Sequence, residues 1–331
     1  MPHNTGCMHV FQFLTVRTPD ATARLVRLGA QPAVSTILDL EDGLWDPLDE
    51  ARTDELKESG REHLVELAGN HAGVLARGSL GVRINRITGS HGHRDIEALG
   101  RAAGHVRFDH VVATKVERGA DLVEVAAALR AAGVGFGTIV PIVETRAGIA
   151  ALDDILEEGL RLGVRWLVFG FFDFALDSGW WPFPDPADPA YWTPLVPVIA
   201  ATEAAGIGHV HAPFFALEDD AAFERLAGRL AATCRLPFGM ISIGRRQTAL
   251  AARLAAGIGG PSAGAGDADV EAAPGGVLGT DPRGLAAGIV AVYAANRRAD
   301  VSFVLDPDTG NFISPHLYLA ARAYLARLTD D

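Results

Sequence analysis

Short apolar runs, rich in Val, Ile, Leu and Phe, recur along the first three quarters of the chain, and more polar segments separate them. Runs of this kind are typical of strands that are buried on both faces of a parallel sheet. They stand at 10–16, 35–42, 81–86, 110–116, 137–143, 165–171, 208–214 and 237–243. Strands that alternate with helical segments in this way predict an α/β protein, and specifically a (β/α)8 TIM barrel.

The segments between the runs have the apolar spacing of helices. Helices are predicted at 21–29, 49–68, 94–103, 121–133, 146–159, 194–206 and 245–257. Glycine follows the Ala-rich segments ALRAAG, TEAAG and ARLAAG, and glycine ends a helix at little cost because it adopts positive φ readily. A doubly wound sheet is the competing architecture, but no GxGxxG phosphate turn opens a helix in this sequence.

Polar residues stand at the C-terminal ends of five of the runs. They are Asp39, Glu41 and Asp42, then Arg83 and Asn85, then Lys115 and Glu117, then Glu144, and finally Asp173. The C-terminal ends of barrel strands meet at one mouth, where the active sites of TIM barrels lie. The pattern therefore predicts an enzyme. His209 and His211 flank a later run, and we expect them to form core or loop hydrogen bonds rather than to catalyse.

The chain is expected to continue beyond the barrel. Four prolines in 177–192 predict an irregular loop on the rim of the mouth. We expect a barrel domain over 1–257, a flexible linker rich in Gly and Ala over 258–284, and a C-terminal lid with a docking helix over 285–331. The last helix is apolar on one face, so we expect it to dock on the barrel or on a neighbouring subunit of a homo-oligomer, a trimer or hexamer.

Charge and cysteine content narrow the possible partners. The formal net charge is −12, so no nucleic-acid partner is indicated. Cys7 and Cys234 form neither a CxxC pair nor a Cys/His cluster, so neither a zinc site nor a disulfide framework is implied. No run reaches the roughly 18 apolar residues needed to span a membrane, and the N-terminus does not resemble a signal peptide. We expect a cytoplasmic protein with no membrane partner.

Five short motifs, in order, resemble those of the HpcH/HpaI aldolase and citrate lyase β-subunit family, and in particular its CitE-like branch within the phosphoenolpyruvate/pyruvate-type barrels. They are LDLEDGL at 38–44, RIN at 83–85, TKVE at 114–117, ETRAG at 144–148 and FGFFDFALD at 169–177. The tail DTGNFISPHLYLAARAYL resembles the family's lid segment and final helix. The resemblance implies a TIM barrel with a Mg²⁺-dependent carbon–carbon lyase or condensing activity on a 2-oxo or β-hydroxy acid, through a metal-stabilised enolate.

The resemblance also implies roles for the polar residues. Glu144 and Asp173 are expected to hold Mg²⁺ or Mn²⁺, hard ions that prefer oxygen ligands. Arg83 is expected to form a bidentate pair with the carboxylate or enolate oxygen of the substrate. Lys115 lies near the mouth and is a candidate catalytic group that also neutralises the neighbouring acids.

The acids after the second strand have less specific roles. One of Asp39, Glu41 and Asp42 is expected to orient Arg83 or a metal-bound water. We take Asp42 as a candidate catalytic residue and Glu41 as a candidate substrate contact. Three residues after the sixth strand are expected to face the ligand through their amides, because glycine allows close backbone approach: Gly170, Phe171 and Phe172.

Three departures from the resemblance leave the substrate open. The segment GMISIGRRQ, 239–247, lacks the GK and IHPxQ-like residues of relatives, and DPLDEAR, 46–52, lacks a lysine. Ser314 stands where acyl-CoA-cleaving relatives often carry an acid. The substrate is therefore expected to be a small anionic 2-oxo acid or an acyl-CoA, with CoA as part of the substrate in the second case. Two alternatives are an aldolase on a free pyruvate-type acid plus an aldehyde, and a non-catalytic metal-binding barrel that serves as a partner subunit.

Overall fold

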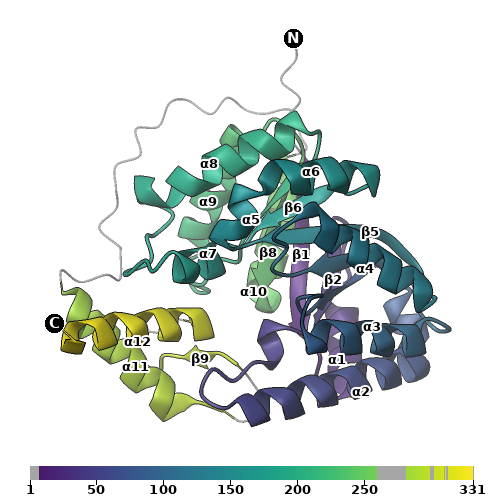
Figure 1. The fold of residues 1–331 in the computed structure, drawn as a ribbon, viewed down its shortest axis with the longest axis horizontal. Coiled ribbons are helices and arrows are strands. Elements are labelled where there is room, and N and C mark those ends of the chain that lie inside the picture. The colour runs from purple at the N-terminus through teal and green to yellow at the C-terminus, as the bar shows by residue number, and fades with distance from the viewer. Residues whose placement is uncertain (1–6, 259–280, 299–301, 309, 311, 331) are drawn as a thin grey trace.

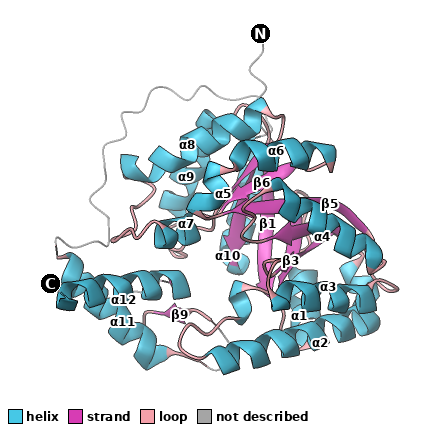
Figure 2. Ribbon diagram, viewed as in Figure 1, coloured by secondary structure: helices cyan, strands magenta, loops and turns pink. Residues whose placement is uncertain are grey.

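The computed structural model describes residues 7–258, 281–298, 302–308, 310 and 312–330. Its centre is a closed barrel of parallel strands that follow one another in chain order, and helices surround this barrel (Figure 1, Figure 2). The barrel strands are β1 Met8–Thr15, β2 Val34–Asp39, β3 Ser79–Ile84, β4 Phe108–Ala113, β5 Phe136–Val143, β6 Trp166–Phe169, β7 Gly208–His211 and β8 Phe238–Ile243. The predicted (β/α)8 TIM barrel is confirmed.

Every barrel strand is followed by at least one helix. The helices of the barrel are α1 Pro19–Gly29, the 3-10 turn η1 Asp42–Leu44, α2 Glu50–Leu75, α3 Ser90–Ala102, α4 Gly119–Ala131, α5 Arg146–Ala150, α6 Leu152–Arg161, α7 Phe171–Asp177, α8 Pro189–Ala204, α9 Asp220–Thr233 and α10 Gly244–Ile258. The prediction of irregular structure over all of 177–192 is wrong at its end. Pro189 occupies the first turn of α8, where a helix does not use the missing N–H.

The sixth strand is shorter than predicted. It ends at Phe169, and Asp173 lies in the first turn of α7 rather than at the strand end. The sequence WLVFGFF contains no polar residue, so its hydrophobic pattern does not show where the strand ends and the helix begins. Gly170 marks the boundary as the residue that precedes the helix.

Side chains along each strand point alternately into and out of the barrel, and this alternation determines which polar residues face the mouth. Every second side chain of a barrel strand points inward. The inward residues that form an apolar cluster are Phe11, Ile37, Val112, Val140, Ile142, Val168, Val210 and Ile241. Asp39 follows Ile37 by two positions and Glu144 follows Ile142 by two, while Arg83 lies beside Asp39 in the strand register. The period that packs the barrel interior therefore also aims these side chains into its mouth.

The C-terminal segment, residues 302–330, folds against the barrel together with α11 Pro282–Asn296. Its elements are a two-stranded antiparallel hairpin of β9 Val304–Leu305 and β10 Phe312–Ile313, followed by α12 Pro315–Asp330. α11 and α12 lie side by side, and α12 also contacts α7 (Figure 1). Most of the linker predicted over 258–284 lies outside the described residues, and the division into domains stays a prediction.

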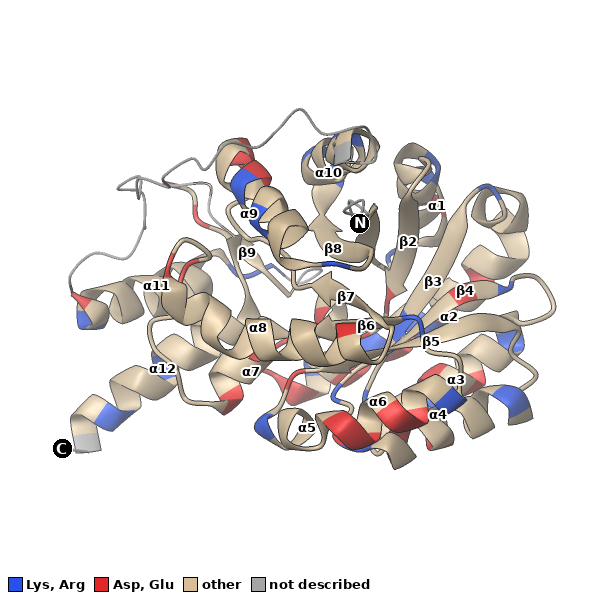
Figure 3. Cartoon of the chain, turned by 90° about the horizontal axis from the view of Figure 1, so that it is seen from above, with Lys and Arg blue, Asp and Glu red and all other residues tan. Residues whose placement is uncertain are grey.

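This segment and α11 share a second, smaller core. It contains Tyr293, Val304, Ile313 and Tyr318, with the two tyrosine rings stacked at a centroid distance of 4.6 Å. None of the helices in the described ranges is long and apolar enough to cross a bilayer. In Figure 3 the basic positions are scattered among acidic ones over the outer helices, in keeping with the net charge of −12.

Candidate active site

A cavity of about 130 Å³ lies at the mouth of the barrel, between the strand ends and the C-terminal segment. Its ionisable and hydroxyl-bearing lining residues are Thr15, Asp39, Asp42, Arg83, Glu144, Asp173, Ser302, Ser314 and His316. Most of the candidate residues predicted from the sequence therefore line one cavity, as do Gly170, Phe171 and Phe172. Lys115 and Glu41 lie directly behind this lining, bonded to each other.

Arg83 is held in place by the acids that precede it. Its Nε and Nη2 atoms each donate a hydrogen bond of 2.7 Å to one carboxylate oxygen of Asp39, and Nη1 donates to Asp42 at 2.9 Å. Asp39 is thus the acid that orients Arg83, one of the possibilities that the sequence left open. The fork expected to grip a substrate carboxylate is engaged by Asp39, so any contact with substrate would fall to the outer edge of the guanidinium.

Lys115 has a left-handed backbone conformation, with a φ of 52°. This conformation is rare for a residue with a side chain and costs on the order of 1 kcal/mol. It turns Lys115 toward the mouth, where Nζ lies 3.0 Å from Glu41 and 3.2 Å from Asp173. The backbone N–H of Lys115 donates to Glu144 Oε1 at 2.8 Å. One strained residue thereby contacts three of the acids.

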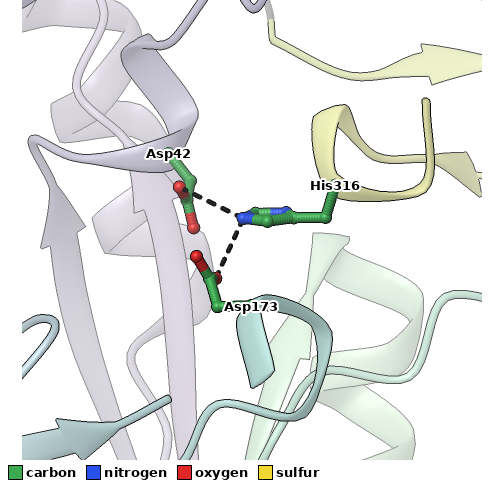
Figure 4. Close-up of side chains that lie close together, drawn as sticks. All are labelled: Asp42, Asp173 and His316. Carbon is green, nitrogen blue, oxygen red and sulfur yellow. Dashed lines mark ion pairs between the residues drawn. The ribbon is translucent and has the colours of Figure 1, made fainter. Parts of the chain in front are cut away.

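His316 is a site residue that the sequence reading missed. It lies in the first turn of α12, is 5% exposed, and points between Asp42 and Asp173 (Figure 4). Its Nε2 atom is 2.9 Å from Asp173 Oδ2 and 3.8 Å from Asp42 Oδ1, yet it forms no hydrogen bond of acceptable geometry with a described residue. The Pro315-His316 pair stands in the lid-like segment of the sequence and could have suggested a site residue. However, no local sequence pattern shows that His316 lies near Asp42 and Asp173, which are far from it along the chain.

Glu144 fits against a glycine. It is 4% exposed, and a Cβ atom at Gly170 would lie only 2.4 Å from Glu144 Oε2, so any larger residue at position 170 would displace the carboxylate. The amide of Gly170 donates to the carbonyl oxygen of Val143 at 3.0 Å. The expectation that this amide faces a ligand is therefore wrong, and Gly170 serves to make room for Glu144.

The acids of the site have displaced pKa values. Burial and the neighbouring Asp173 raise the pKa of Glu144 well above its usual range. Burial and Glu41 raise the pKa of Asp42 to about 6. Burial alone would raise the pKa of Asp173, but His316 and Lys115 lower it to about 2. Burial alone would lower the pKa of His316, but Asp173 and Asp42 raise it to about 9.

Carboxylates outnumber cations at this end of the cavity. The carboxylates are Asp39, Glu41, Asp42, Glu144 and Asp173, and the Lys and Arg side chains among them in the described chain are Lys57, Arg83 and Lys115. Lys57, which the sequence reading also passed over, is buried in α2 with Nζ 3.5 Å from the carbonyl oxygen of Glu41. These carboxyl groups gather oxygen donors at one place, and a bound cation would favour the deprotonated forms of Glu144 and His316, whose pKa values are raised.

The donor set suits a divalent cation. Asp42, Asp173 and His316 each offer a ligand atom, and these three atoms lie within 4.8 Å of one another. Glu144 uses Oε1 to accept from Lys115 and leaves Oε2 beside Gly170. Carboxylate oxygens suit Mg²⁺ and Mn²⁺, and an imidazole nitrogen extends the set toward the transition metals.

The residues Arg245, Arg246 and Gln247, which follow the eighth strand, do not line the cavity. Arg246 pairs on the surface with Asp220, with 3.1 Å between Nη2 and Oδ2. Gln247 accepts from the amide of Ile243 and donates to the carbonyl oxygen of Phe214. The strand itself lines the cavity with Ile241 and Ile243. No replacement for the missing lysine and histidine comes from this part of the described chain.

The comparisons with known proteins agree with this architecture. A family model described as HpcH/HpaI aldolase/citrate lyase matches residues 16–232, and no curated protein sequence matches the chain. RipC from Yersinia pestis superimposes with a TM-score of 0.54 at 22% identity, over 78% of this chain and 98% of its own.

Two structures of CitE from Mycobacterium tuberculosis also superimpose. The complex with magnesium and acetoacetate has a TM-score of 0.55 at 20% identity, over 79% of this chain and 94% of its own. The complex with magnesium, acetoacetate and coenzyme A has a TM-score of 0.55 at 18% identity, over 97% and 98%. At these identities the likeness supports the fold. His316 lies beyond the part of the chain that the family model matches.

Proposed function

The chain belongs to the HpcH/HpaI aldolase/citrate lyase family, and from this premise we propose that it is a carbon–carbon lyase or condensing enzyme that acts on a small 2-oxo or β-hydroxy acid and depends on a divalent cation. The observation that carries the proposal is the convergence of Glu144, Asp173, Asp42 and His316 on one end of the cavity. The magnesium in the CitE complexes from Mycobacterium tuberculosis supports the same kind of cofactor here.

We assign the cation to Asp173 and Glu144, with His316 as an adjoining donor. When bound, it would supply the positive charge that holds the carboxylate and oxo oxygens of the acid and stabilises the negative charge that develops there. Asp173 faces Lys115 through Oδ1 and His316 through Oδ2. To ligate the cation it must give up one of these ion pairs, while Lys115 keeps its bond to Glu41.

The surrounding residues position the acid and move a proton. Arg83 keeps Asp39 as its fixed partner and presents its outer edge to the cavity. Asp42 lines the cavity and accepts from Arg83 Nη1 through Oδ2, and we propose it as the proton carrier within reach of a bound substrate. Lys115 is a positioning residue, because its ammonium group pairs with both Glu41 and Asp173. The C-terminal segment covers these groups and keeps water from the reacting acid.

A direct assay tests the proposal and separates it from its alternatives. The protein would be incubated with Mg²⁺, pyruvate and a panel of aldehydes, and in parallel with 3-hydroxyacyl-CoA thioesters, and the products followed by NMR. A product that forms only with a thioester supports a CoA-dependent lyase. A product formed from free pyruvate supports the aldolase alternative, which Ser314, lying where an acid would be expected, favours. Mg²⁺ binding without any product would favour the non-catalytic barrel and reject the proposal.

A further inference from the structure

The cavity has two unlike ends. The acids, Arg83 and His316 line the cavity from β2, β3, the residues that follow β2, β5 and β6, and α12, whereas the lining from β8, the loop after β7 and the hairpin of the C-terminal segment is mostly apolar and includes Phe215, Phe312, Ile241 and Ile243. The apolar end has no role in holding a cation or in moving a proton. Its side chains therefore bear on which molecule the site accepts.

Four phenyl rings at this end form a continuous stack. The ring of Phe172 lies on Phe215 at a centroid distance of 4.2 Å, Phe215 lies on Phe312 at 4.7 Å, and Phe312 lies on Phe303 at 4.4 Å. The interplanar angles are 23°, 25° and 26°. The stack begins on α7, passes through the loop after β7 and ends on the hairpin of the C-terminal segment. All four rings line the cavity, so barrel and segment build its apolar wall jointly.

The apolar end has no partner for a second charge. Arg83 is the only Lys or Arg among the described lining residues, and its N–H groups are bonded to Asp39 and Asp42. A carboxylate placed against the stacked rings would be buried without a cation, which is costly.

We infer that the substrate carries, beyond its reacting 2-oxo acid, an apolar group that packs on these phenyl rings, and not a second carboxylate. This inference rests on the proposed function. The acid would lie against Asp173 and His316, and the apolar group against Phe215 and Phe312. Such a substrate is a 4-hydroxy-2-oxo acid, R–CH(OH)–CH₂–CO–COO⁻, with R apolar.

Cleavage of this substrate balances without a further reactant. The hydroxyl group loses its proton and becomes the carbonyl of R–CHO. The electron pair of the bond between the hydroxyl-bearing carbon and the CH₂ carbon passes to the fragment that bears the oxo acid, and that fragment takes up a proton to give pyruvate. The apolar wall would hold R while the bond breaks.

Calorimetric titration of the full chain loaded with Mg²⁺ tests the inference without relying on turnover. Phenylpyruvate is compared with pyruvate, which lacks the ring, and with 2-oxoglutarate, which carries a carboxylate one carbon farther from the oxo acid than the ring. We expect phenylpyruvate to bind at least about tenfold more tightly than either, on the scale of burying an apolar group. Phe215→Ala should weaken phenylpyruvate binding by a similar factor and leave pyruvate binding unchanged.

Two further variants serve as a fallback and as a control for this test. Phe215→Leu keeps most of the buried volume and is used if Phe215→Ala does not fold. Phe214→Leu is the matched control, because its ring is directed toward Phe223 at 6.1 Å and does not line the cavity. Equal or tighter binding of 2-oxoglutarate overturns the inference and leaves the proposed function standing. Binding of none of the three acids overturns the inference, and the assay with 3-hydroxyacyl-CoA thioesters then decides whether the proposed function stands.

Discussion

At the scale of single residues, Asp173 is where the charges of the site converge. It pairs with Lys115 on one side and His316 on the other, and it shares a possible ligand set with Asp42. A carboxylate with two cationic partners is held rigidly before any ligand arrives, which favours a fixed geometry. The same arrangement requires His316 to change its role when a divalent cation binds.

His316 provides a prediction about that change. If Nε2 ligates the cation, protein loaded with Mn²⁺ will show a nitrogen coupling from a histidine ligand in electron spin-echo spectra. His316→Gln removes the imidazole, so we expect the coupling to disappear and the affinity for Mn²⁺ to fall by at least about tenfold. His93→Gln, at an exposed histidine of α3, is the control. A coupling that survives in His316→Gln would assign it to another residue.

At the scale of elements, the sequence predicts which strand-end side chains reach the mouth, because the same alternation of inward and outward side chains fills the barrel core and points these residues into the mouth. Asp39 and Glu144 follow the inward residues Ile37 and Ile142 by two positions, and Arg83 lies beside Asp39 in the strand register, so their place in one cavity could be predicted. The end of β6 at Phe169 was not readable, because apolar residues continue without interruption into α7. His316 was missed because its proximity to Asp173 depends on how the C-terminal segment packs, which no local pattern encodes.

β7 carries two buried histidines, and only one of them meets the expectation of a hydrogen-bonded role. His211 lies 2.9 Å from the hydroxyl of Tyr191, whereas neither ring nitrogen of His209 has a partner in the described chain. Burial and His211 lower the pKa of His209 to about 3, and burial lowers that of His211 to about 4. Both rings therefore stay neutral in the folded chain under conditions where the unfolded chain is protonated.

This difference predicts how stability depends on pH. Between the unfolded value of about 6.5 and the lowered values, the unfolded chain binds more protons, so the free energy of unfolding falls as pH falls, by about 1.4 kcal/mol per pH unit for each histidine. His209→Leu should flatten the slope by that amount between pH 6 and pH 4.5 in urea titrations. His105→Gln, at an exposed turn, is the control. An unchanged slope in His209→Leu would show that His209 already takes up its proton when folded.

At the scale of the whole molecule, the site is shared between the barrel and the C-terminal segment. The barrel supplies Glu144, Asp173 and Arg83, while the segment supplies His316 and half of the phenyl stack. The segment shares a second core, around Tyr293 and Tyr318, with α11, while Ala320 of α12 belongs to the main core of the barrel. The expected homo-oligomer and cytoplasmic location stay predictions.

Removal of the segment should therefore separate folding from function. A chain that ends at residue 258 keeps all eight barrel strands and is expected to fold, as judged by circular dichroism. It loses the cover of the cavity, so we expect turnover to fall by at least about a hundredfold, since water then reaches the reacting acid. Turnover close to that of the full chain would show that the barrel alone forms the complete site.

The central claim is that a divalent cation at Asp173 lets this chain remove a proton from a 2-oxo acid. Exchange of the methyl protons of pyruvate for deuterium in D₂O, followed by NMR, measures this step without knowledge of the second substrate. With Mg²⁺ we expect exchange at least about a hundredfold faster than with EDTA. Asp173→Asn should lose this acceleration, and Asp177→Asn, in the same helix, should keep it. Exchange that is no faster with Mg²⁺ than with EDTA, or undiminished in Asp173→Asn, would contradict the account.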